Sequence, residues 1–295
     1  MIKQTLLFQT PVSLSLHYNQ LVITNRENGA KTTRPIEDVG VVVVEHPQVR
    51  MTVPLLNMLA DNNVSVVFCD ERKMPKSMLM SLEGNTTLQE SYTSQVEASD
   101  AMKRQVWKQL VESKIRNQSF LLDNVGKDGR VLRPFYQNVK SGDSDNREGA
   151  AARTYWSLLF GADFRRNRDG APPNNLLNYG YSILRAAVAR ALISSGLYPA
   201  FGVFHRNRYN AFPLADDVME PYRPFVDEIV YRLYYDSAEN ELNEFTKPYL
   251  LRLLVADVRM DQITRPLQVA LSMTTASLAK FYKKQTNTLS LPTFL

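Results

Sequence analysis

Three side chains in the second half of the sequence have the donor types that bind a divalent metal ion: Glu148, His205 and Glu220. Two carboxylates and one neutral imidazole suit Mg²⁺ or Mn²⁺ better than a closed structural zinc site. Such an ion can polarise a phosphodiester oxygen and stabilise the charge that develops when a hydroxyl displaces the leaving oxygen. Asp217 stands three residues before Glu220, on the same face of a helical turn, and is a candidate assisting carboxylate.

Each of these residues also has a purely structural interpretation. Asp145 and Glu148 are spaced as a helix N-cap and a carboxylate that reaches back to it. His205 follows an apolar segment, where a hydrogen-bonded structural histidine is common. Glu220 could lie on a solvated helix face or pair with Arg223. Spacing alone leaves both interpretations open, because sequence order does not prove that the side chains converge.

Arginine is frequent in the same half of the chain. The sequence has 35 Lys and Arg against 30 Asp and Glu, a formal net charge of +5 that does not by itself indicate nucleic-acid binding. A guanidinium group can hold two phosphate oxygens at once. The candidate DNA contacts are Arg165, Arg166, Arg206, Arg208 and Arg223. The alternative for each of them is an ordinary surface ion pair.

The composition indicates a folded protein that does not enter a membrane. The chain has 295 residues, of which 44% are hydrophobic, so it can bury a substantial core. Because we find neither an apolar run of membrane-spanning length nor a signal-peptide pattern, we expect a cytoplasmic protein. Cys69 is the only cysteine, which excludes an internal disulfide and any cysteine-rich metal site. A bound metal would therefore need oxygen and imidazole ligands.

Residues 1–75 are predicted to form a small, mainly β-sheet domain with one short helix. Alternating apolar residues indicate strands, and Asn19-Gln20 is the expected turn of a hairpin. The apolar run at 40–44 is typical of a strand that is buried on both faces. A change to helical spacing over 53–60 predicts a helix with Pro54 in its first turn. The expected strands cover residues 5–8, 14–18, 21–23, 40–44 and 64–68.

Residues 76–97 lose this periodicity and are predicted to be a linker. Residues 98–295 are predicted to form a larger, all-α catalytic domain, because apolar residues keep helical spacing from Met102 onward and again over 177–192. The tail after Lys284 is expected to be irregular or weakly docked. The predicted fold class is therefore α+β, with the sheet domain first.

Four short motifs occur in the helical region. They are NREGAAARTYW at 146–156, NNLLNYGY at 174–181, GVFH at 202–205 and DVMEPYRPFVD at 217–227. In order and spacing they resemble the first CRISPR-associated protein family, the integrase of spacer acquisition, in the form found in type II systems. The β-rich front, the connecting segment and the helical body also fit that family's layout. The resemblance thus covers nearly the whole chain.

The resemblance implies that Glu148, His205 and Glu220 are the catalytic metal ligands, with Mg²⁺ or Mn²⁺ as the cofactor and Asp217 assisting directly or through water. The implied reaction is a transesterification, in which the 3′-hydroxyl of a captured DNA fragment attacks a phosphodiester at the edge of a CRISPR repeat. One departure is the loop RNRYN at 206–210, because many members outside type II have a less basic, glycine-containing loop there. The extra charge leaves the detailed DNA contacts open.

The resemblance also implies partners. DNA is expected both as the prespacer and as the CRISPR repeat with its leader. The sheet domain is expected to mediate a homodimer, and two dimers are expected to flank the small second CRISPR-associated protein in a heterohexameric complex. Other type II CRISPR proteins are further candidates, and no membrane is expected.

Two rival functions use the same residues differently. A DNA-binding scaffold without catalysis would pair the carboxylates with arginines and grip DNA with its basic surface. A metal-dependent nuclease of branched DNA would activate water in place of a 3′-hydroxyl. Dependence on metal separates the scaffold from the enzymes, and product analysis separates joining from cleavage.

Overall fold

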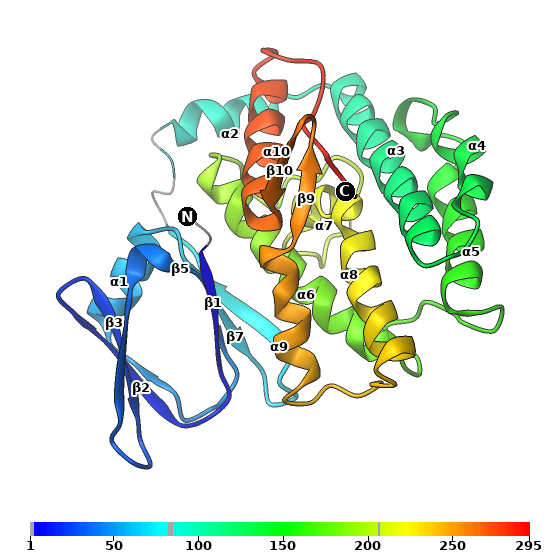
Figure 1. Ribbon diagram of the computed structural model, residues 1–295. Coiled ribbons are helices and arrows are strands. Elements are labelled where there is room, and N and C mark those ends of the chain that lie inside the picture. Colours follow the sequence, from blue (N-terminus) through cyan, green and yellow to red (C-terminus); the bar gives the residue numbers. More distant parts are fainter. Residues whose placement is uncertain (1–2, 82–84, 86, 206) are drawn as a thin grey trace. The chain divides into compact units, whose positions relative to one another are not determined.

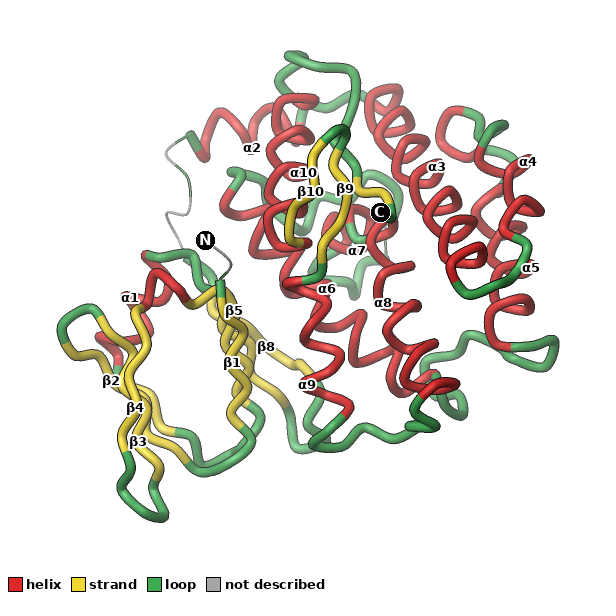
Figure 2. The backbone as a smooth tube through the Cα atoms, in the orientation of Figure 1, coloured by secondary structure: helices red, strands yellow, loops and turns green. Residues whose placement is uncertain are grey.

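The chain forms two compact units, Met1–Thr86 and Thr87–Leu295 (Figure 1). The structure is a computed structural model that describes residues 3–81, 85, 87–205 and 207–295. Strands dominate the first unit and helices the second (Figure 2). This arrangement agrees with the predicted α+β class. Among the described residues, no helix is long and apolar enough to cross a membrane.

The first unit contains two four-stranded sheets. Its elements are β1 (Gln4–Phe8), β2 (Val12–His17), β3 (Gln20–Asn25), β4 (Lys31–Pro35), the 3₁₀ turn η1 (Ile36–Asp38), β5 (Val39–Val44), β6 (Arg50–Met51), α1 (Val53–Asp61), β7 (Ser65–Cys69) and β8 (Pro75–Leu79). One sheet has the order β1-β5-β7-β8 and the other β4-β3-β2-β6. β5 pairs in parallel with both β1 and β7, and five of its six residues are buried, as predicted for a central strand.

The hairpin of β2 and β3 turns one residue earlier than expected. His17 pairs with Gln20, so Tyr18 and Asn19 form the two-residue loop. Both have positive φ, 43° and 58°, as a type I′ turn requires. The polar pair Asn19-Gln20 suggested the later position, but strand register decides which residues occupy the turn.

The segment predicted as a linker, 76–97, contains regular structure from both units. β8 hydrogen-bonds along β7 as an edge strand. Helix α2 (Leu88–Val96) belongs to the second unit, where Gln95 exchanges hydrogen bonds of 2.9 Å with the backbone N–H and C=O of Tyr198. The linker prediction was wrong for both stretches. It missed α2 because this helix buries polar side chains, Ser91 and Gln95, in place of an apolar stripe. Residues 82–84 and 86 lie outside the described part of the chain.

The second unit is a helical body that packs around two long helices. Its helical elements are α2, α3 (Asp100–Asn124), η2 (Gly129–Leu132), α4 (Arg133–Tyr136), η3 (Ser141–Asp143), α5 (Arg147–Phe160), α6 (Asn174–Ser194), α7 (Pro213–Val218), η4 (Glu220–Tyr222), α8 (Arg223–Tyr231), the π-helical turn η5 (Arg232–Asp236), α9 (Thr246–Leu251), η6 (Arg252–Val255) and α10 (Leu267–Tyr282). α3 contacts η3, η4, α5 and α8, whereas α6 contacts α7, α8, α9 and α10. These contacts bring sequence-distant helix ends together.

The second unit is not all-α. β9 (Asp257–Met260) pairs antiparallel with β10 (Ile263–Pro266) and with β11 (Pro292–Thr293) near the carboxyl end of the chain. Phe294 follows β11, is buried, and stacks on Phe225 with ring centroids 4.2 Å apart. The tail is therefore docked, contrary to expectation. Strands of two to four residues carry too few alternations to be recognised from sequence, and the pairing of β11 with β9 is non-local.

Candidate active site

The two predicted glutamate ligands meet at the ammonium group of Lys114. Its Nζ lies 2.5 Å from Glu148 Oε1 and 2.6 Å from Glu220 Oε2. Lys114 comes from α3, Glu148 is the second residue of α5, and Glu220 opens η4. α3 packs against both of the other elements. The fold therefore brings together the two carboxylates that spacing alone could not place.

Glu148 does not cap its own helix. Asn146, in the left-handed conformation with φ 51°, accepts a backbone N–H from the first turn of α5 at 3.1 Å. Asp143 accepts the N–H groups of Arg147 at 2.7 Å and Glu148 at 3.0 Å. Asp145 instead pairs with Arg147 at 2.8 Å. The capping-box interpretation is wrong, and the Glu148 side chain is left to interact with Lys114.

Glu220 is a buried carboxylate between two cations. Only 3% of the residue is exposed, and its Oε1 lies 2.9 Å from Nε of Arg223, the arginine that spacing suggested as its partner. Burial by itself would raise the pKa of Glu220, but the charges of Arg223 and Lys114 outweigh it and lower the pKa. Burial likewise opposes the charge of Lys114, while Glu220 and Glu148 raise its pKa. Glu220 and Lys114 are therefore both charged at neutral pH.

Asp217 holds the loop that carries His205. It is fully buried and accepts the backbone N–H groups of Val203 at 2.6 Å, Phe204 at 3.2 Å and His205 at 3.1 Å. The ring Nδ1 of His205 lies 2.6 Å from Asp217 Oδ1, and this contact raises the pKa of His205 although burial opposes it. Gly202 makes the approach feasible, because a Cβ there would lie 3.0 Å from Asp217 Oδ2. Asp217 thus orients the imidazole and leaves Nε2 for another partner.

The side chains of Glu148, His205 and Glu220 have donor types that suit a divalent ion, but they are not arranged as a metal-binding group. Among the described residues, no three His, Cys, Asp or Glu side chains are grouped closely enough to hold a metal. Lys114 stands between the two glutamates, and His205 Nδ1 is turned toward Asp217. Oε2 of Glu220 is buried and accepts no hydrogen bond of good geometry, even though it forms the ion pair with Lys114. Lys114 has a flexible stem, so its ammonium can give way to a more highly charged cation.

The candidate DNA-contacting arginines occupy different environments. Arg165 and Arg208 are exposed, and Arg208 stacks on Tyr209, its guanidinium 4.7 Å from the ring centroid. Arg166 is half-buried and donates to two asparagine side chains of α6, and Arg223 pairs with Glu220. Arg206 lies outside the described residues. Arg165 and Arg208 are thus the better placed for a phosphate.

Two residues of this site were missed from the sequence, and both lie on α3. Trp107 is buried, stacks on Phe204 with ring centroids 4.1 Å apart, and meets the His205 ring edge-on at 5.7 Å. Lys114 follows Trp107 by two helical turns, so both occupy the face that also buries Leu110. A lysine inside an apolar stripe was the signal that could have found Lys114, because buried lysines are paired.

Behind the site lies a buried carboxylate with two tyrosine donors. Asp227 is 1% exposed, accepts a hydrogen bond from Tyr155 at 2.7 Å and accepts another from Tyr181. Burial raises the pKa of Asp227 to about 6, although both tyrosine hydrogen bonds oppose the change. These contacts tie α5 and α6 to α8 and fix the base of the site.

This raised pKa predicts a pH dependence of stability. Between about pH 4 and 6 the unfolded chain ionises Asp227 while the folded chain keeps the proton, so stability falls as pH rises through this window. Relative to Asp227→Asn, the unfolding free energy of the wild type should fall by roughly 2.4 kcal/mol from pH 4 to pH 7. Urea unfolding of both proteins at several pH values measures it. A constant difference between the two proteins contradicts the raised pKa.

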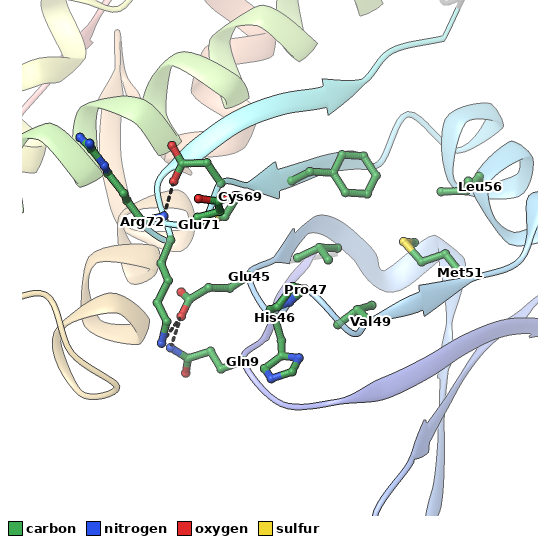
Figure 3. A pocket seen from close by; sticks show the side chains of 14 residues that line it. Gln9, Glu45, His46, Pro47, Val49, Met51, Leu56, Cys69, Glu71 and Arg72 are labelled. Carbon is green, nitrogen blue, oxygen red and sulfur yellow. Dashed lines mark hydrogen bonds and ion pairs between the residues drawn. The ribbon is translucent and has the colours of Figure 1, made fainter.

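The first unit contains a separate pocket of about 990 Å³ (Figure 3). Met51 and Leu56 line its apolar end. At the polar end, Glu45 accepts a hydrogen bond from Gln9 at 3.3 Å and pairs with Lys73 at 3.5 Å. The described residues that line this pocket form no group of three His, Cys, Asp or Glu side chains that could hold a metal ion.

Comparisons with known proteins show the family to which the chain belongs. The family model of "CRISPR associated protein Cas1" matches residues 6–249. The CRISPR-associated endonuclease Cas1 of Neisseria meningitidis serogroup C (strain 8013) is 38% identical over 262 residues, which cover 88% of this chain and 85% of that protein.

Two solved structures have the same fold. A casposase bound to an integration product superposes with a TM-score of 0.80 at 19% identity, covering 98% of this chain and 93% of that one. A chain of a Cas6-RT-Cas1–Cas2 complex gives a TM-score of 0.73 at 18% identity, covering 98% of this chain and 36% of that one. From the family match over most of its length and the identity to the Neisseria protein, the chain belongs to the Cas1 family of CRISPR-associated proteins.

Proposed function

We propose that this protein is a divalent-metal-dependent DNA integrase and endonuclease that inserts captured DNA into a CRISPR array. The observation that carries the proposal is the convergence of Glu148 and Glu220, from separate elements, on one buried cation, with His205 held beside them by Asp217. Membership of a family of CRISPR-associated endonucleases and a fold shared with a casposase bound to an integration product support it.

Glu148, His205 and Glu220 would hold Mg²⁺ or Mn²⁺, which supplies Lewis-acid stabilisation of the charge on the reacting phosphate. Asp217 keeps the His205 ring oriented through Nδ1, which would leave Nε2 available to bind the ion. Lys114, once displaced from the two glutamates, provides a positive charge for a phosphate oxygen.

In the joining reaction, the 3′-oxygen of the captured fragment forms a bond to phosphorus at the repeat edge. The bond from that phosphorus to the 3′-oxygen of the repeat strand breaks. The attacking hydroxyl loses its proton, and the departing oxygen gains one. Attack by water at the same site gives endonuclease cleavage in place of joining.

The proposed partners are DNA, a second copy of the chain and the small second CRISPR-associated protein. Exposed Arg165 and Arg208 would hold the DNA backbone, while DNA shape and partner proteins select the insertion site. The similarity of fold to a chain in a Cas6-RT-Cas1–Cas2 complex supports a Cas2 partner. We further propose that the first unit forms the homodimer, that two dimers flank the small partner in a heterohexamer, and that other type II CRISPR proteins join it.

The test is a product assay with the purified wild-type protein. A short duplex with 3′-hydroxyl ends is incubated with a repeat-bearing supercoiled plasmid, with or without Mn²⁺ or Mg²⁺ and with or without the small partner. We expect covalent joining that requires the metal. Cleavage without joining would favour the nuclease, and binding without either reaction would favour the scaffold.

A further inference from the structure

Phe204 presents an exposed aromatic face next to His205. Phe204 is 47% exposed as a residue, yet its ring lies parallel to buried Trp107, with an interplanar angle of 2° and ring centroids 4.1 Å apart. Because Trp107 covers one face, the exposure belongs to the edges and the opposite face. A large aromatic ring that packs on the protein core through one face and exposes the other is suited to stack on a nucleic-acid base.

Hydrogen bonding and packing hold the Phe204 ring in its position. The backbone N–H of Phe204 donates to the buried carboxylate of Asp217 at 3.2 Å, which fixes the loop on which the ring stands. Trp107 lies on α3 and is 1% exposed, so the ring on which Phe204 stacks is part of the core. The His205 ring meets both aromatics edge-on, at centroid distances of 5.7 Å. Asp217 and Trp107 therefore position both the His205 imidazole and the exposed Phe204 ring.

The distance between the Phe204–Trp107 stack and the two glutamates at Lys114 fits a nucleotide adjacent to the reacting phosphate. Trp107 and Lys114 lie on one face of α3, which places them about 10 Å apart along the helix axis. A phosphate at Glu148 and Glu220 therefore has its neighbouring bases within reach of Phe204. Lys114 and exposed Arg208 add the positive charge that a DNA backbone needs on this side.

We propose that Phe204 stacks on an unpaired base of the DNA strand that carries the reacting phosphate. The inference rests on the proposed integrase function and deepens it by naming a base-binding residue. Stacking of this kind is tolerant of sequence, because every base has an aromatic face. Phe204 would thus fix the position of the strand without selecting its sequence.

Binding to abasic DNA tests the proposal without chemistry. The probe is a synthetic branched duplex, in which a 3′ end is already joined to a repeat strand, and single abasic sites are placed up to two nucleotides on either side of the junction. Its affinity for the full-length protein is measured in EDTA. We expect an abasic site at one of these positions to weaken binding by the wild-type protein about 10-fold. Phe204→Leu should bind the intact DNA about 10-fold less tightly than the wild type does. An abasic site at the same position should not weaken binding by Phe204→Leu any further.

Two variants complete the design. Phe204→Tyr keeps the ring and should keep the sensitivity to the abasic site. Phe245→Leu removes an equally exposed aromatic side chain elsewhere, 56% exposed, and should behave as the wild type. Equal abasic sensitivity in the wild type and Phe204→Leu, or no sensitive position, would overturn the stacking role alone. If the wild-type protein bound no branched DNA, the integrase proposal and this inference would both fail.

Discussion

Glu148→Ala and Glu220→Ala are both expected to reduce metal-dependent strand joining by roughly 10³-fold or more, because each removes a proposed charged ligand of the ion that would stabilise the transition state. Their effects on stability should differ. Glu220 is 3% exposed and neutralises Arg223 as well as Lys114, so its loss takes from Arg223 the carboxylate with which it pairs and leaves Lys114 with Glu148 alone. Removing one partner of such a buried pair costs about 3–5 kcal/mol.

Glu148→Ala should cost much less stability. The Glu148 side chain is 25% exposed, and Lys114 keeps Glu220 as its partner when Glu148 is removed. We expect a loss of about 1–2 kcal/mol, the value of one hydrogen bond to a charged group. The contrast separates the ligand role that the two glutamates share from the structural role that only Glu220 has.

Three measurements are needed for this pair of variants: joining activity, Mn²⁺ affinity by calorimetric titration, and urea unfolding. Glu148→Asp serves as the matched control, because it keeps the charge and should retain part of the metal affinity. If Glu148→Ala bound Mn²⁺ as tightly as the wild type while remaining folded, the metal assignment would have to be abandoned.

Asp217→Ala is expected to destabilise the protein by about 3–5 kcal/mol, because several donors lose the buried carboxylate that accepts their hydrogen bonds. The donors are the backbone N–H groups of residues 203–205 and the ring of His205. Strand joining should fall with it, since the imidazole loses its orientation. Asp217→Asn keeps one acceptor oxygen and should retain most of the fold, with activity about 10–100-fold lower.

His205→Ala is the informative partner of this variant. Its side chain is 37% exposed, so its removal should abolish joining while leaving the thermal midpoint close to that of the wild type. A double-mutant cycle of Asp217→Asn with His205→Ala measures the coupling in activity. Additive effects of the two substitutions, or a large drop in midpoint for His205→Ala alone, would contradict an orienting role for Asp217.

The sequence by itself was sufficient for the division into a β-rich front and a helical body. Period-two alternation predicted β2 and the buried run predicted β5, because both patterns report burial within one element. It failed at α2, which buries polar side chains, and at the three short strands β9, β10 and β11. α2 and β11 make their stabilising contacts with residues distant in sequence, and β9 and β10 form a hairpin too short for a clear alternation, so local periodicity reports none of them.

For the site, the sequence determined the donor types and the tertiary structure decided their roles. Residue type, motif and order predicted two glutamates and a histidine as metal ligands. Only packing showed that Lys114 stands between the glutamates and that Asp217 is committed to the His205 loop. Roles of this kind depend on which side chains meet across α3, α5 and η4, and helix–helix packing fixes such meetings through contacts distant in sequence.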